Sequence, residues 1–210
     1  MTNKSQSGFS LLELAIALAV LAILTGGVLK GRELLNSARV QSTITDLSAL
    51  ETAFAAFQSR YAALPGDFIA VQAAGLGNLA GNGNGLIEGD EECQVFQHLQ
   101  AAGFIQGSFR AETENTLDCT RSQLMPNQFG DEYRISHQYE GPSSLENTLA
   151  IRIGQSVPVA QLAELDRKLD DGNPLRGVLQ VDSAETALCT VNNAWDEADG
   201  QPCAAYYFLR

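Results

Sequence analysis

Three residues near the N-terminus have the types and spacing to do chemistry. Glu13 is the only charged residue between Phe9 and Leu29, and Gly8 directly precedes this apolar segment. A carboxylate inside an apolar segment costs about 2.5 to 3.5 kcal/mol on insertion into a bilayer, so a cationic partner is expected close by. Cleavage after Gly8 would provide that cation, because the new amine of Phe9 would lie about one helical turn from Glu13. The spacing predicts an amine and a carboxylate that enter the membrane together.

The residues around this acid carry a recognisable pattern. Residues 8–14 read Gly-Phe-Ser-Leu-Leu-Glu-Leu. This segment resembles the processing site of type IV prepilins and of the pseudopilins of type II secretion systems. In that family a membrane-embedded aspartic peptidase cuts after the glycine and methylates the exposed residue. The resemblance implies that Gly8 is the cleavage site, that Phe9 becomes the N-methylated end, and that Glu13 neutralises the amine of a neighbouring subunit during filament assembly.

A long helix must position these residues. Residues 9–29 would span about 31 Å as a helix, which is enough to cross a bilayer. Residues 1–8 hold one cation, Lys4, and no apolar stretch, so the pattern is not that of an ordinary secretory signal. Beyond residue 29, apolar side chains recur at steps of three and four, which predicts an amphipathic continuation over residues 30–62. This stripe consists of Val40, Ile44, Leu47, Leu50, Phe54, Phe57 and Tyr61.

The middle of this helix departs from the family pattern. Many pilins carry a proline near this point, whereas this chain has Lys30. Gly26, Gly27 and Gly31 lie there instead, each costing about 1 kcal/mol relative to alanine. They indicate either a point where the helix bends or a face of small residues for close helix packing. The missing proline, together with a large C-terminal domain that contains cysteines, favours a minor or pilin-like subunit.

The remainder, residues 63–210, has the size of one globular domain. The helix should stop at residues 61–67, Tyr-Ala-Ala-Leu-Pro-Gly-Asp, because a residue before proline is driven out of the helical region. This segment also resembles a group of prepilin-like proteins. Short strand candidates follow, and a helix is expected over residues 93–107 and another over residues 157–169. We expect an α+β, type IV pilin-like fold, with the N-terminal helix packed on an antiparallel sheet.

All four cysteines lie in this domain, at Cys93, Cys119, Cys189 and Cys203. An even count is typical of an oxidising compartment. We favour the pairs Cys93–Cys119 and Cys189–Cys203, because both close short local loops. A zinc site is the alternative, but the chain contains no C-x-x-C and its two histidines are far apart in sequence, so the ligand spacing favours disulfides.

A glycine- and asparagine-rich stretch partly matches a calcium loop. On that template Asn82 and Asn84 occupy ligand positions, Gly85 takes the turn and Glu91 is the closing acid. Ala80, however, stands where an aspartate belongs. Composition favours an ordinary Asn-Gly turn connection over calcium binding, and we expect no other cofactor.

Two further groups of polar residues bear on function. Asp166, Asp170 and Asp171 could attract a cation, although a solvated turn at the end of the expected helix is the favoured interpretation. The two histidines, His98 and His137, have no identifiable catalytic partner, and the sequence contains no nucleophile elbow, phosphate loop or zinc-helix signature. We therefore expect a protein that is not an enzyme.

The resemblance to type IV prepilins and pseudopilins implies a structural subunit and the placement and partners that follow. The chain would be a single-pass inner-membrane protein with a periplasmic C-terminal domain, and after processing it would join a filament at the cell surface or in the periplasm. Its partners would be the prepilin peptidase and methylase, other pilin or pseudopilin subunits and, indirectly, the assembly platform and its ATPase. The alternatives are a secretion pseudopilin, a filament-tip subunit for adhesion or DNA uptake, or a singly anchored protein with an uncleaved helix. A net charge of −12 makes nucleic acid an unfavourable partner.

Overall fold

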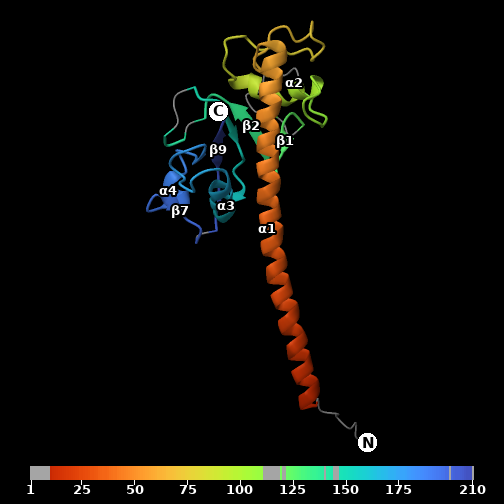
Figure 1. Cartoon of the computed structure of the whole chain (residues 1–210), viewed down its shortest axis with the longest axis vertical. Coiled ribbons are helices and arrows are strands. Elements are labelled where there is room, and N and C mark those ends of the chain that lie inside the picture. The colour runs from red at the N-terminus through yellow and green to blue at the C-terminus, as the bar shows by residue number, and fades with distance from the viewer. Residues whose placement is uncertain are drawn as a thin grey trace, which may run out of the picture. The chain divides into compact units, whose positions relative to one another are not determined.

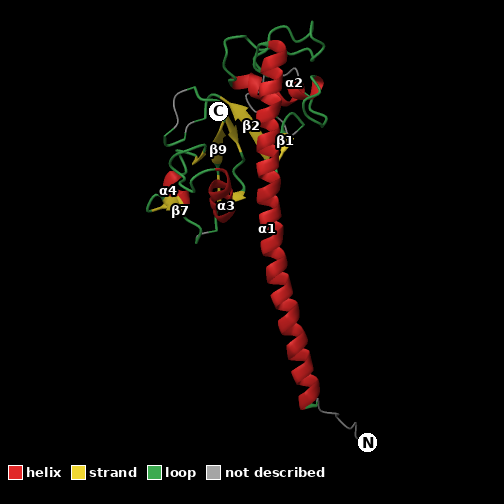
Figure 2. Cartoon of the chain, viewed as in Figure 1, coloured by secondary structure: helices red, strands yellow, loops and turns green. Residues whose placement is uncertain are grey.

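The computed structural model describes residues 10–110, 119, 122–139, 141–143, 147–198 and 200–209. The chain divides into two units, Met1–Ala38 and Arg39–Arg210. Helix α1, Leu11–Tyr61, passes through both units. The second unit adds short helices and an antiparallel sheet, so the fold is α+β and type IV pilin-like (Figure 2).

The second half of α1 is amphipathic, as the stripe of apolar residues predicts. Two residues of this stripe, Ile44 and Tyr61, are partly buried against the hydrophobic core of the second unit. The helix ends at Tyr61, and Ala62 takes a left-handed conformation with φ 51° before the Leu-Pro-Gly-Asp turn. The fully buried side chains of this half are Val40, Thr43, Leu47, Leu50, Ala53, Phe54 and Phe57.

The central sheet has five strands in the order β1-β2-β3-β9-β5, and every pairing is antiparallel. Figure 1 labels β1, β2 and β9 of this sheet. Its strands are β1 (Met125–Pro126), β2 (Glu132–Ser136), β3 (Ala150–Arg152), β9 (Ala205–Phe208) and β5 (Leu179–Val181). Side chains alternate between the two faces of such a sheet. The face that carries Tyr133 and Tyr207 packs on α1: the Tyr133 hydroxyl donates to Asp46 Oδ2 at 3.1 Å and the Tyr207 hydroxyl donates to Glu51 Oε2 at 3.3 Å.

Short elements complete the second unit. They are η1 (Gly89–Cys93), α2 (Val95–Ala101), β4 (Val157–Pro158), α3 (Val159–Leu169), α4 (Thr186–Cys189), β6 (Thr190–Val191), β7 (Ala194–Trp195) and β8 (Pro202–Cys203). Strand β4 pairs with β8, and β6 pairs with β7 in a hairpin. The start of the helix expected over residues 157–169 is therefore a short strand, and α3 begins at Val159.

The helix expected over residues 93–107 is shorter than predicted. A 3₁₀ turn ends at Cys93 and α2 stops at Ala101. Gly103 has a φ of +80°, and the Phe104 N–H donates to the Leu99 carbonyl at 2.9 Å. This glycine-terminated pattern of hydrogen bonds closes an α-helix.

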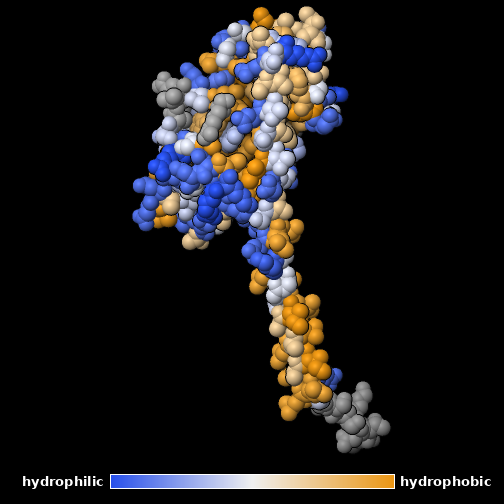
Figure 3. Space-filling view, in the orientation of Figure 1, coloured by the Kyte–Doolittle hydropathy of each residue, from blue (hydrophilic) through white to orange (hydrophobic). Residues whose placement is uncertain are grey.

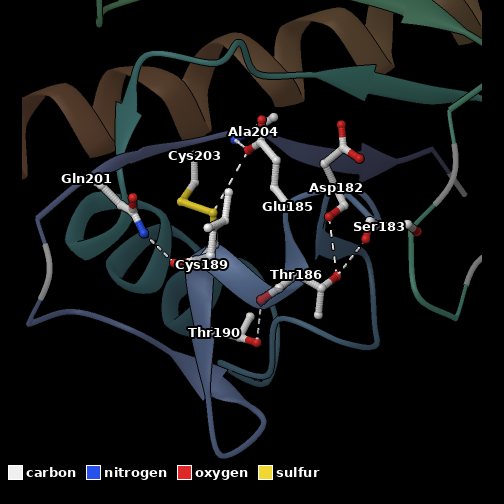
Figure 4. The surroundings of a disulfide bond; sticks show 10 residues. Asp182, Ser183, Glu185, Thr186, Cys189, Thr190, Gln201, Cys203 and Ala204 are labelled. Carbon is white, nitrogen blue, oxygen red and sulfur yellow. Dashed lines mark hydrogen bonds between the residues drawn. A yellow bond between two sulfur atoms is a disulfide. The ribbon is translucent and has the colours of Figure 1, made fainter.

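Two disulfides cross-link the second unit, in the pairs that the sequence favours. Cys93 joins Cys119 with a Cα–Cα distance of 5.2 Å, and Cys189 joins Cys203 at 6.2 Å. The second bond ties α4 to β8, beside a hydrogen bond of 2.6 Å from the Ala204 N–H to Glu185 Oε2 (Figure 4). Links of this kind typically contribute about 2 to 4 kcal/mol of stability.

Candidate functional site

The first half of α1 is apolar on every side. From Leu11 to Leu29 every side chain is exposed, with Leu11 at 89% and Ile23 at 75%. On the face drawn in Figure 3, this half of the helix is almost entirely hydrophobic. Within the described residues this is the one helix that is long and apolar enough to cross a membrane. A helix that is apolar all round belongs in a membrane or inside an assembly. Its cover must therefore come from lipid or from other chains.

Glu13 lies in the first turn of this helix. Ser10 precedes the helix, and its Oγ accepts the Leu12 N–H at 3.3 Å, which is the bond of an N-terminal cap. The spacing of Ser10 and Glu13 is that of a capping box, a signal that our sequence analysis overlooked. The carboxylate is exposed near the positive end of the helix dipole. Gly8 and Phe9, the predicted cleavage and methylation residues, lie outside the described residues.

The apolar stretch ends at an ion pair. Lys30 Nζ lies 2.6 Å from Glu33 Oε2, with both side chains largely exposed. The helix continues without a break through Gly26, Gly27 and Gly31. A Cβ added at any of these three glycines would meet nothing within 4 Å, so contacts within the described chain do not explain them. Both interpretations of these glycines, a bend and a close-packing face, remain predictions.

In the second unit, the Leu-Pro-Gly-Asp turn and the glycine- and asparagine-rich loop come together around Asp67. This carboxylate is 4% exposed. Its Oδ1 accepts the N–H groups of Gly83 at 2.6 Å and Asn84 at 3.1 Å, and its Oδ2 accepts the Gly85 N–H at 2.8 Å. Successive backbone N–H groups that converge in this way form an anion-binding nest. The Leu-Pro-Gly-Asp turn thus supplies the anion that the glycine-rich loop encloses.

The calcium hypothesis concerns Asn82, Asn84 and Glu91 in the same loop. Asn82 Oδ1 accepts the Asn84 N–H at 2.8 Å, and Asn84 Oδ1 accepts the Leu86 N–H at 2.8 Å. Glu91 Oε1 accepts the Asn82 N–H at 2.8 Å, and burial raises the pKa of Glu91. Each of these side chains already holds a backbone N–H group. The arrangement favours the Asn-Gly turn connection, and calcium binding stays a prediction.

Both histidines hold the segment between α1 and η1 through contacts with its backbone, which the sequence did not indicate. His98 is fully buried, its Nδ1 accepts the Gly66 N–H at 2.9 Å, and its Nε2 lies 3.1 Å from the Leu79 carbonyl oxygen. His137 Nδ1 accepts the Ile87 N–H at 2.7 Å. Accepting through Nδ1 requires the neutral ring. Burial lowers the pKa of each histidine and so keeps it neutral.

The acidic group at the end of α3 is only partly a solvated turn. One oxygen from each of Asp166, Asp170 and Asp171 lies within 4.8 Å of the others. Asp166 is fully buried, and the Trp195 indole N–H donates to its Oδ2 at 2.8 Å. Burial, together with the charges of Asp170 and Asp171, raises the pKa of Asp166 to about 6. Asp171 pairs with Arg176 at 2.8 Å. Sequence reasoning missed the contact with Trp195, which lies far along the chain.

Comparison with known protein families gives a match at the N-terminal segment. Residues 3–29 match the family described as the prokaryotic N-terminal methylation motif. This motif is the class III signal peptide of type IV pilins and pseudopilins, and the match confirms the resemblance. Neither a curated protein nor a solved structure matches the chain.

The buried His98 generates a prediction for the pH dependence of stability. In the unfolded chain this histidine titrates near 6.5, and its folded pKa is lower. The unfolded state therefore binds more protons below that pH, and the contribution of His98 is complete above it and lost as the pH falls. His98→Gln keeps an acceptor for Gly66 and a donor for Leu79 but does not titrate. Denaturant unfolding between pH 7.5 and 5 should show the stability of the wild type falling relative to this variant.

Three acids, Glu91, Glu92 and Asp166, have raised pKa values, which favour the folded state at lower pH. Because the wild type and His98→Gln both contain these acids, their effect cancels in the difference between the two unfolding free energies. A difference in unfolding free energy that stays constant over this pH range would contradict the neutral role of His98.

Proposed function

We propose that this protein is a minor pilin or pilin-like subunit that a prepilin peptidase cleaves after Gly8 and methylates at Phe9. Its N-terminal helix then carries it into a type IV pilus-like filament. One observation carries the proposal: the exposed apolar half of α1 begins with Glu13 in its first turn and lies inside a matched methylation motif.

Lipid covers the apolar half of α1 before assembly, and neighbouring subunits cover it afterwards. In the membrane, lipid covers the apolar side chains, but Glu13 remains a charge that is costly to hold there. In a filament, neighbouring helices cover the same side chains through van der Waals packing. The methylated amine of Phe9 on one subunit can then pair with Glu13 on another. Assembly thus removes the cost that the single subunit carries in lipid.

The segments predicted from the sequence take roles in this proposal. Residues 1–8 are the leader, residues 9–29 the membrane and filament-core helix, residues 30–62 its amphipathic continuation and residues 63–210 the exported domain. This domain lies in the periplasm before assembly and in the filament afterwards. The peptidase and other pilin or pseudopilin subunits are the direct partners, with the assembly platform and ATPase acting indirectly.

Within this class we favour a minor subunit over a major pilin. The chain has an exposed Lys30–Glu33 pair where many pilins carry a proline, and two disulfides stabilise its large exported domain. A secretion pseudopilin and a tip subunit for adhesion or DNA uptake are the alternatives. The net charge of −12 argues against a role in binding DNA.

Processing can be tested by intact mass measurement of the protein from cells that contain their own peptidase. The wild type should lack residues 1–8 and carry one added methyl group, whereas Gly8→Ala should keep the leader. A wild type that retains residues 1–8 would contradict the proposal and indicate a singly anchored protein.

Assembly can be tested through Glu13. Glu13→Gln leaves the neighbouring amine buried without a partner, and breaking a buried pair in this way costs about 3 to 5 kcal/mol. The variant should be processed normally but be nearly absent from sheared filaments, while Glu13→Asp should retain part of its incorporation. Glu33→Gln is the matched control, because Glu33 is an exposed carboxylate on the same helix. Incorporation of Glu13→Gln at the level of the wild type would contradict the proposed pairing.

A further inference from the structure

The loop that encloses Asp67 contains two Asn-Gly pairs. Asn82 and Asn84 are the only asparagines in the sequence that precede a glycine. In such a pair the glycine nitrogen can lose its proton and attack Cγ of the asparagine side chain. The bond from Cγ to the side-chain nitrogen breaks, ammonia leaves and a succinimide ring forms. Water then opens the ring to aspartate or isoaspartate. Glycine favours this attack because it has no side chain to obstruct it.

Both pairs are open to the solvent that this reaction requires. Asn82, Gly83, Asn84 and Gly85 are all exposed. Gly83 and Gly85 have φ values of +74° and +86°, which glycine adopts without strain. Burial therefore does not keep water away from either pair. Protection must come from the hydrogen bonds of the loop.

Hydrogen bonds to Asp67 restrain both attacking nitrogens. Gly83 N donates to Asp67 Oδ1 at 2.6 Å, and Gly85 N donates to Asp67 Oδ2 at 2.8 Å. A negative charge at hydrogen-bond distance disfavours loss of the amide proton, because the product would be a second anion beside it. The bonds also direct each N–H toward Asp67 and fix the peptide planes. One carboxylate thus restrains the nucleophile of both pairs.

The side chains under attack are restrained as well. Asn82 Oδ1 accepts the Asn84 N–H, and Asn84 Oδ1 accepts the Leu86 N–H, each at 2.8 Å. Asn84 Nδ2 donates to Glu88 Oε1 at 2.9 Å. Rotation of either amide toward its glycine nitrogen would break at least one of these bonds.

Asp67 itself is fixed by close packing. The Gly81 N–H donates to the Phe68 carbonyl at 3.1 Å. A Cβ on Gly81 would lie 2.3 Å from the Cα of Asp67, so the loop and the Leu-Pro-Gly-Asp turn are in direct contact there. We propose that Asn82 and Asn84 are latent deamidation sites, and that Asp67 keeps both closed by holding Gly83 N and Gly85 N.

This arrangement makes the two sites interdependent. Deamidation of one asparagine adds a carboxylate close to Asp67 and Glu91. The new carboxylate repels these two acids, because like charges repel. Asn82 also holds Glu91 in place, since its backbone N–H donates to Glu91 Oε1. The first modification therefore loosens the loop and accelerates the second. A filament subunit in the external medium would gain long-term chemical stability from an intact Asp67.

The test follows deamidation in the full-length protein at mildly alkaline pH by peptide mapping. After reduction of the Cys93–Cys119 disulfide, trypsin releases residues 61–110 as one peptide that contains both pairs, since this segment holds no lysine or arginine before Arg110. The folded wild type should deamidate at least about tenfold more slowly than the same protein in urea, as expected where reaction requires local opening. Equal rates in the folded and unfolded states would overturn the proposal.

Two variants assign the protection to Asp67. Asp67→Asn should accelerate deamidation at both pairs, whereas Asp90→Asn, a matched change in η1, should leave the rate as in the wild type. If Asp67→Asn fails to fold, hydrogen exchange of the wild type still tests the role of Asp67. The Gly83 and Gly85 amides should then be protected from exchange. Unprotected exchange at these glycines, no acceleration in a folded Asp67→Asn, or equal acceleration by Asp90→Asn would each overturn the role of Asp67.

Discussion

The apolar first half of α1 must be covered by something other than water. Moving one large apolar side chain out of water contributes about 1.5 to 3 kcal/mol, and this segment exposes many of them, among them Leu11, Leu18 and Ile23. A bilayer covers these side chains, but Glu13 is costly to hold there. In the filament that we propose, neighbouring helices would cover the apolar side chains and an amine would pair with Glu13. The methylation motif at residues 3–29 fits this proposal, because cleavage after Gly8 would create that amine.

Covalent cross-links and buried polar contacts hold the second unit together. Two disulfides cross-link it, and its longest connection folds back on the protein through Asp67, His98 and His137. Each of these three side chains accepts backbone N–H groups from the segment between α1 and η1. The connection is therefore held by charge-assisted and buried hydrogen bonds, which compensate for its lack of regular secondary structure.

Local patterns made much of this structure predictable. The apolar stripe from Val40 to Tyr61 gave the buried face of α1, the proline motif gave its end, and the short spacings between cysteines gave the disulfide pairs. Long-range polar contacts were not predictable. Asp67 receives its N–H groups from residues 16 to 18 positions away, and Asp166 meets Trp195 across 29 positions. No periodic pattern in the sequence predicts such contacts. They depend on glycines with positive φ values and on the path that each loop takes across the protein.

We propose that helices of other subunits cover the apolar half of α1. Photo-crosslinking in cells from a reactive side chain at Ile16, which is 57% exposed one turn beyond Glu13, tests this packing most directly. We expect crosslinks to other subunits that carry the same methylation motif, and loss of these crosslinks when Gly8→Ala blocks processing. Crosslinks to lipid alone, in cells that assemble filaments, would contradict it.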